Sequence, residues 1–287
     1  MINANIELAT KYLPYVDEVF TQASKKELLT SKDFSIGGEA TSGAHYVKIY
    51  KISTAEMNDY GRKGPEDGNW SRYGALDSLD ATTEEFKIEK DRSFTFVIDT
   101  LDTDETGHQL NAAEALNRQI RQVVIPEVDT YTYGVMCDKA GTKPEAVELT
   151  ADNIYDEIIK ASTVLDDALV PETGRVLTVT PEVYQLMKKS KDIVMETEVG
   201  SDMRIKGVIG NLDGMNVVRI ASARLPENFG FMLVHPCATV APTKLKSYRT
   251  HLNPPGIDGV LVEGRIVYDA FVLENKAKAI YYQAKIN

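Results

Sequence analysis

The chain has 287 residues, which is enough for one large domain or two ordinary ones. A hydrophobic fraction of 43% supports a real core, and a charged fraction of 26% argues against a chain that is disordered throughout. The net charge of −11 argues against a protein that binds nucleic acid independently of sequence, because such a protein needs a basic surface. It is compatible with an acidic surface that lies near nucleic acid without adhering to it.

Polar and small residues fill most of the first forty or so positions, and no domain pattern begins before His45. A short amphipathic helix is expected near Glu7–Ser24, interrupted at Pro14. Residues 1–43 therefore look like an arm. An arm can fold back on its own subunit or cross to another one, and we slightly favour the crossing.

Alternating side chains predict strands over His45–Ser53 and Glu84–Glu89, with the strand pattern continuing to Ile98. About thirty polar, glycine-rich residues lie between them, and loops of that length are usually functional or disordered. A two-stranded hairpin is marginal alone, so we expect it to dock on its own domain or on a neighbouring subunit. Aromatic and basic residues near its tip are candidate contact residues, unless the tip is simply solvated. They are Tyr60, Arg62, Lys63, Trp70, Arg72 and Tyr73.

A long helix is predicted from Asp104 to about Val135, and the chain is organised around it. Asp102 or Thr103 is expected to cap its start, and Pro126 to kink or break it. At about 1.5 Å per residue it would be about 45–50 Å long, which suits either core helices of an ordinary α/β protein or the spine of an extended subunit. One face carries apolar residues at helical spacing. These are Leu116, Ile120, Val124, Val128, Tyr131 and Val135.

The middle of the chain, about residues 145–240, alternates helix and strand patterns and predicts a compact α/β lobe. Thr150 is expected to cap a helix that ends before Pro171, and Thr180 followed by Pro181 opens a second helix. Strands are expected at Val176–Val179, Met203–Ile209, Met215–Ile220 and Phe231–His235.

The last part, Gly259 to Ile286, is rich in strand patterns and is expected to pack against the long helix. A turn is predicted at Glu274–Ala277, after which Ala279–Tyr282 should pair back on the preceding strand. Pro254–Gly256 marks the crossing into this tail.

Candidate catalytic groups do not form a convincing set. His235 follows an apolar strand and is expected to be structural, and neither Cys137 nor Cys237 has a sequence context that would activate a thiol. Acidic residues beside the long helix could bind a cation, but capping is favoured. These are Asp99, Asp102, Asp104 and Glu105. We expect no catalytic residue, metal or cofactor, and hence no enzyme.

Targeting signals are also not evident. The first ten residues lack the basic start and apolar run of a secretory signal, and no stretch approaches the roughly 20 apolar residues of a membrane span. We therefore expect synthesis in a cytosol and no membrane partner.

Several runs resemble the major capsid proteins of tailed bacteriophages of Gram-positive hosts, from about residue 80 to the end. The runs are Lys90–Thr95, Asp99–Asp102, Asp104–Thr106, Val123–Asp129, Val240–Pro242, Lys244–Leu245, Pro254–Gly259, Val262–Arg265 and Tyr268–Leu273. The resemblance implies the α+β Hong Kong ninety-seven-like fold. Its parts would be an N-terminal arm (1–43), an extended β-hairpin loop (44–98), a peripheral domain with the spine helix (99–144 and 241–287) and an α/β axial domain (145–240).

The resemblance also implies a function. The protein would assemble through pentamers and hexamers into an icosahedral shell enclosing double-stranded phage DNA, in the bacterial host cytoplasm, and would reside in the virion. Portal and separate scaffolding proteins would be partners, since no long helical extension precedes the arm, and DNA would be enclosed rather than bound by sequence. An encapsulin-like nanocompartment, or a cytosolic α/β enzyme with the middle lobe as its catalytic domain, are the alternatives.

Overall fold

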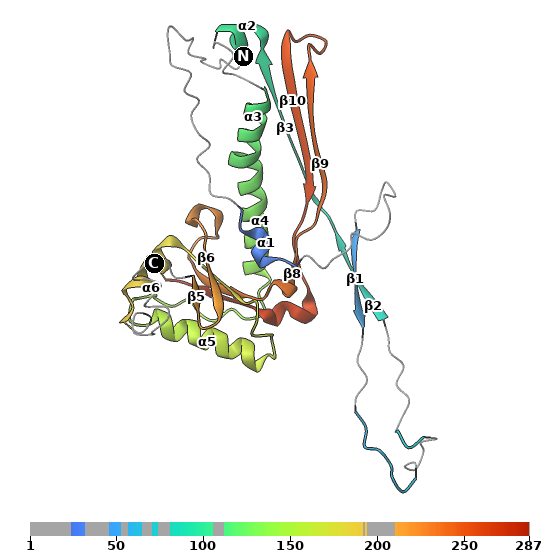
Figure 1. Ribbon diagram of the computed structural model, residues 1–287, viewed down its shortest axis with the longest axis vertical. Helices are drawn as coiled ribbons and strands as arrows, with labels where there is room; N and C mark the ends of the chain where they lie inside the picture. The colour runs from blue at the N-terminus through green and yellow to red at the C-terminus, as the bar shows by residue number, and fades with distance from the viewer. Residues whose placement is uncertain are drawn as a thin grey trace. The chain divides into compact units, whose positions relative to one another are not determined.

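The computed structural model describes residues 24–31, 46–52, 57–64, 71–73, 81–105, 112–191, 193 and 210–286. The chain divides into two compact units (Figure 1). The smaller unit is Phe34–Ile88, and the larger one combines Met1–Asp33 with Glu89–Asn287. Among the described residues, no helix combines the length and apolar character that a membrane crossing requires.

The smaller unit contains a two-stranded antiparallel hairpin. Strand β1 (Tyr46–Ile52) pairs with β2 (Ala81–Lys87) along its whole length. This confirms the predicted hairpin. The strand pattern predicted to continue to Ile98 is present as a separate strand, β3 (Lys90–Asp99), which pairs in a different sheet of the larger unit. The smaller unit ends at Ile88, and the domain bounds of 44–98 stay a prediction. Alternation reveals a strand but not its partner.

A three-stranded antiparallel sheet extends along one side of the larger unit (Figure 1). Strand β10 (Gly259–Tyr268) lies at its centre, between β3 and β9 (Thr243–Leu252). Helix α2 (Thr100–Glu105) follows β3 directly, and the Asp99 Oδ1 atom accepts a hydrogen bond from the Leu101 amide at 2.9 Å. Asp99 is thus the N-terminal cap, and the prediction of Asp102 or Thr103 is wrong because both lie inside α2.

The spine helix is continuous from Ala112 to Asp138 and about 40 Å long at about 1.5 Å per residue. It comprises α3 (Ala112–Gln119), a π-helical segment η1 (Ile120–Val124) and α4 (Ile125–Asp138). The helix runs through Pro126, which lies in the first turn of α4, directly after the wide π turn. A π turn changes the hydrogen-bonding partners, and so accommodates a residue without an amide hydrogen. The predicted start near Asp104 falls beside residues 106–111, outside the described ranges.

A five-stranded sheet forms the middle lobe, in the order β12-β7-β4-β6-β5. The strands are β4 (Val176–Val179), β5 (Asn211–Leu212), β6 (Met215–Arg219), β7 (Phe229–Val234) and β12 (Ile280–Ala284). Helices α5 (Ile154–Asp167) and α6 (Pro181–Lys189) pack on one face through a shared apolar cluster. The other face packs on the end of α4 through Tyr133, Met136 and Cys137.

The two threonines expected to cap helices in this lobe do accept hydrogen bonds from backbone amides at the helix starts. The Thr150 hydroxyl accepts a hydrogen bond from the Asn153 amide at 3.3 Å, and the Thr180 hydroxyl accepts one from Val183 at 3.2 Å. The pairing of the last strand was wrong: β12 joins β7 in the lobe sheet and does not return onto the preceding strand. The predicted strand at 203–209 lies outside the described residues.

Short elements complete the larger unit. Strands β8 (Thr239–Val240) and β11 (Phe271–Val272) pair with each other, and η4 (Glu274–Ala279) provides the predicted turn. Two further 3₁₀ helices are η2 (Ser222–Arg224) and η3 (Pro236–Ala238).

The described part of the arm, residues 24–31, folds back on its own chain. Helix α1 (Lys26–Leu29) places Leu29, which is fully buried, in the same cluster as Tyr133 and Met136 of α4. The Ser31 amide donates to the Thr239 carbonyl at 2.8 Å. For these residues the favoured expectation of a crossing arm is wrong. The amphipathic pattern before Ser24 lies outside the described residues.

Candidate functional site

The tip of the hairpin unit brings together most of the residues proposed from the sequence. The rings of Tyr60 and Tyr73 meet edge to face, with centroids 5.0 Å apart, and the Gly61 amide donates to the Arg72 carbonyl at 2.9 Å. Tyr60 is 51% exposed and Tyr73 is 77% exposed. Aromatic rings held outward in this way are typical of contact surfaces.

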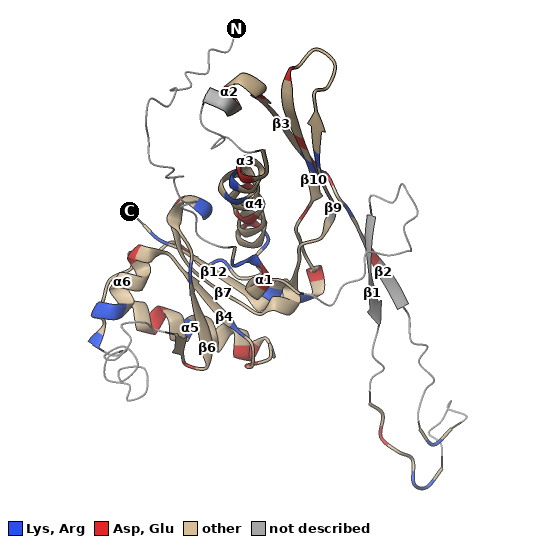
Figure 2. Ribbon diagram, turned by 45° about the horizontal axis from the view of Figure 1, so that its top comes forward, with Lys and Arg blue, Asp and Glu red and all other residues tan. Residues whose placement is uncertain are grey.

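Three basic residues adjoin these two tyrosines in the sequence. Arg62, Lys63 and Arg72 are all exposed, and Figure 2 shows blue segments at the same tip. Trp70, the remaining candidate, lies outside the described residues. The contact role of the six residues stays a prediction, since it concerns a partner molecule.

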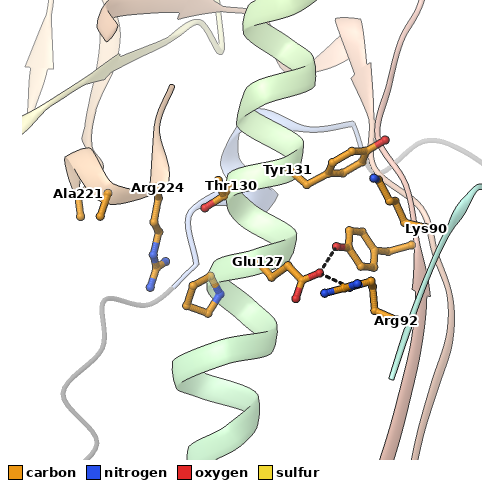
Figure 3. Close-up of a pocket in the computed structure, with 10 residues that line it drawn as sticks. Lys90, Arg92, Glu127, Thr130, Tyr131, Ala221 and Arg224 are labelled. Atoms are coloured by element: carbon orange, nitrogen blue, oxygen red, sulfur yellow. Dashed lines mark hydrogen bonds and ion pairs between the residues drawn. The ribbon is translucent and has the colours of Figure 1, made fainter. Parts of the chain in front are cut away.

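A groove of about 660 Å³ runs along α4 in the larger unit (Figure 3). On one side the Arg92 Nε atom donates to Glu127 Oε1 at 2.7 Å, and the Tyr268 hydroxyl donates to the same oxygen at 3.2 Å. Burial, with Glu127 as a smaller cause, raises the pKa of Tyr268 to about 12. On the other side, Arg224 of η2 closes the groove. The sequence suggested none of these contacts.

Asp269 forms a buried junction beside this groove. Its Oδ1 atom accepts hydrogen bonds from the Tyr131 hydroxyl at 2.7 Å and from the Ala270 amide at 2.8 Å. Its Oδ2 atom accepts from the Glu89 amide at 2.9 Å. Burial, and then the hydrogen bond to Asp269, raise the pKa of Tyr131 above its ordinary value. The junction therefore ties α4 to the residue directly before β3 and to the residue directly after β10.

A second buried carboxylate, Asp129, joins the arm to the lobe. Arg224 Nη1 donates to its Oδ2 atom at 3.0 Å, and the Ser24 hydroxyl donates to its Oδ1 atom at 2.7 Å. Burial raises the pKa of Asp129, while Ser24, Arg224 and Lys26 act in the opposite direction. No sequence pattern pointed to this site, because an aspartate in a helix is usually exposed.

The groups considered for catalysis have structural roles in the fold. His235 Nε2 lies 3.2 Å from the Thr173 carbonyl oxygen, and its Nδ1 atom accepts from the Cys237 amide at 3.3 Å. Burial raises the pKa of Cys137 to about 12, which disfavours a thiolate nucleophile. Within the described ranges, no group of three or more His, Cys, Asp and Glu side chains is placed to hold a metal ion.

Comparison with known proteins assigns a family to this architecture. A family model described as "Phage capsid protein" matches residues 81–283. None of the curated proteins matches the sequence.

Solved structures match nearly the whole chain. The structure titled "Mycobacterium phage Che8" is 20% identical with a TM-score of 0.73, covering 99% of this chain and 98% of its own. The capsid of cyanophage P-SCSP1u is 12% identical with a TM-score of 0.75, over 97% and 93% of the two chains. The mature capsid of bacteriophage PhiM1 is 15% identical with a TM-score of 0.69, over 98% and 93%. At these identities the likeness establishes the fold.

Proposed function

Since the chain belongs to the phage capsid protein family, we propose that its pentamers and hexamers form an icosahedral shell enclosing double-stranded phage DNA. The protein is a structural major capsid protein of the virion, with a Hong Kong ninety-seven-like α+β fold. Assembly takes place in the bacterial host cytoplasm, with a portal and a separate scaffolding protein as further partners. DNA is enclosed rather than bound by sequence, because the net charge of −11 keeps the wall from adhering to phosphate.

The hairpin tip is the observation that supports assembly most directly. A two-stranded hairpin is marginal in water, and this one presents Tyr60 and Tyr73 outward among three basic residues. Burying two tyrosines and pairing nearby arginines is a frequent way to gain affinity at a protein interface. The tip is therefore proposed to contact a neighbouring copy of this chain.

The far end of the three-stranded sheet is a second proposed contact surface. Three large apolar side chains are exposed there or in the adjoining α2: Val97 at 49%, Leu101 at 62% and Leu252 at 77%. The sheet register puts Leu252 and Val97 at the same end but on opposite faces, because Leu252 pairs with Val260 and Val97 pairs with Leu261, the next residue of β10. We propose that these side chains, exposed on both faces at one end of the sheet, become buried between subunits.

Sedimentation and electron microscopy of the purified protein test the proposal. We expect capsomers or closed shells from the wild-type chain and soluble, folded subunits that do not close from a Tyr60→Ala/Tyr73→Ala double variant. A Tyr60→Phe/Tyr73→Phe variant keeps both rings and should assemble. Normal shells from the alanine variant would remove the tip from the mechanism. Shells from infected cells that hold a protein cargo instead of DNA would contradict genome packaging.

A further inference from the structure

The start of β3 carries an unusual series of specific contacts. Four consecutive residues each engage a different partner within the larger unit. The Glu89 amide donates to Asp269 at 2.9 Å, and Lys90 Nζ lies 4.9 Å from the centroid of the Tyr131 ring. Asp91 accepts from Arg265 at 2.9 Å, and Arg92 Nε donates to Glu127 at 2.7 Å. The side chains of Lys90, Arg92, Glu127 and Tyr131 converge in Figure 3.

Asp269 differs from the other partners because it is buried. It is 4% exposed, whereas Asp91 and Arg92 carry side chains that are 47% and 62% exposed. Both of its oxygens accept hydrogen bonds from groups on other segments or on its own loop. A buried carboxylate with all of its partners in place fixes geometry more firmly than exposed ion pairs do.

These contacts lie at the end of β3 that adjoins the hairpin unit, so they would resist separation of β3 from β10. Lys90 and Tyr268 form the last pair of the β3–β10 ladder, and β3 is an edge strand. Glu89 follows Ile88, the last residue of the hairpin unit. Any pull on the hairpin reaches the ladder at this end, where an edge strand can separate one pair at a time.

We propose that Asp269 is a positioning residue that clamps Glu89, the residue directly before β3, to the spine helix, so that a hairpin held by a neighbouring subunit does not peel β3 from its sheet. This inference rests on the proposed shell function. The clamp acts through two hydrogen bonds, from the Glu89 amide and from the Tyr131 hydroxyl, which together connect the strand to α4. The exposed pairs of Asp91 and Arg92 then only support it.

Amide hydrogen exchange of the unassembled full-length subunit tests the clamp. An Asp269→Asn substitution keeps the shape of the side chain, but it replaces one charged acceptor by an amide group. We expect exchange at residues 89–92 to become about tenfold to hundredfold faster, the factor for losing a hydrogen bond to a charged acceptor. Exchange in β4 and β7 should stay unchanged. Asp91→Asn is the matched control, and it should leave residues 89–90 nearly unaffected.

Shell formation tests the consequence. We expect Asp269→Asn subunits to give fewer closed shells, or shells that open at lower temperature, while Asp91→Asn behaves like wild type. Unchanged exchange at residues 89–92 in Asp269→Asn would overturn the clamp. Faster exchange with normal, equally heat-resistant shells would overturn its role in assembly. If wild-type subunits never assemble, the proposed function fails, but the exchange experiment still decides whether the clamp exists.

A second variant keeps the test valid if Asp269→Asn does not fold. Tyr131→Phe removes only the hydroxyl that donates to Asp269 and leaves the Glu89 contact in place. Exchange at residues 89–92 should then rise severalfold, less than in Asp269→Asn. No change in this variant would mean that Asp269 does not connect β3 to the spine helix.

Discussion

Replacing Asp129 by alanine should destabilise the subunit by about 3–5 kcal/mol, the cost of removing one partner of a buried ion pair. The side chains of Arg224 and Asp129 are 8% and 2% exposed, so solvent screens their interaction little. The substitution also removes the acceptor of the Ser24 hydroxyl. Against a typical total stability of about 5–15 kcal/mol, this loss would be large.

The two partners should not be equivalent. A guanidinium stays charged at all accessible pH values, so Asp129→Ala leaves a permanent buried charge. A carboxyl can lose its charge by binding a proton, and burial already raises the pKa of Asp129. Arg224→Met should therefore cost less, and its deficit should shrink as the pH falls, because the folded state then binds the proton more tightly than the unfolded one.

Urea unfolding of the unassembled subunits at neutral pH measures these differences by linear extrapolation. Glu182→Ala is the control, because it breaks the exposed pair with Lys285 and should cost at most about 1 kcal/mol. A double Asp129→Leu/Arg224→Met variant should recover much of the loss. An Asp129→Ala cost no larger than that of the control would refute the reasoning.

Other variants and titrations give shorter tests. Gly264→Ala should lower stability by about 1–3 kcal/mol in thermal melts, because the new Cβ would lie 2.3 Å from the Phe94 ring. Gly134→Ala should raise it by up to about 1 kcal/mol, because no atom lies within 4 Å and the site is helical. With a pKa of about 12, Cys137 should resist iodoacetamide at pH 8 in the native protein and react after unfolding, as mass spectrometry can show. The pKa of Tyr268 is raised to about 12, so its contribution to stability is complete below its ordinary pKa of about 10 and is lost towards pH 12, which circular dichroism can follow.

The sequence predicted elements whose signals are local. Thr150 and Thr180 each stand where a helix needs an amide acceptor, and both serve that role. The cap was misplaced at Asp102 or Thr103 because several acidic residues lie close together here, and it is Asp99 that accepts from the Leu101 amide at the start of α2. The hairpin and the tip residues were recognisable from alternation and from the long glycine-rich interval.

Long-range pairings were not predictable in the same way. Alternation shows that Ile280–Ala284 is a strand, but it holds equally for pairing with the preceding strand or with β7. The buried carboxylates Asp129 and Asp269 were invisible for a similar reason. Each becomes buried only when segments distant in sequence meet, as Ser24, Arg224 and the spine helix do.

The spine helix explains why those buried carboxylates occur where they do. Its sequence predicts one apolar face, yet it has two: Val124 and Val128 pack against Ile266 and Tyr268 of β10, while its C-terminal turns pack against the five-stranded sheet. A helix packed on both sides has few exposed positions, so the polar side chain of Asp129 is buried and is hydrogen-bonded to groups inside the protein. The same packing makes the larger unit one body. Forces that enter at β3 can then reach the lobe through α4 and through the chain that follows β10, and Asp269 lies where these two routes begin.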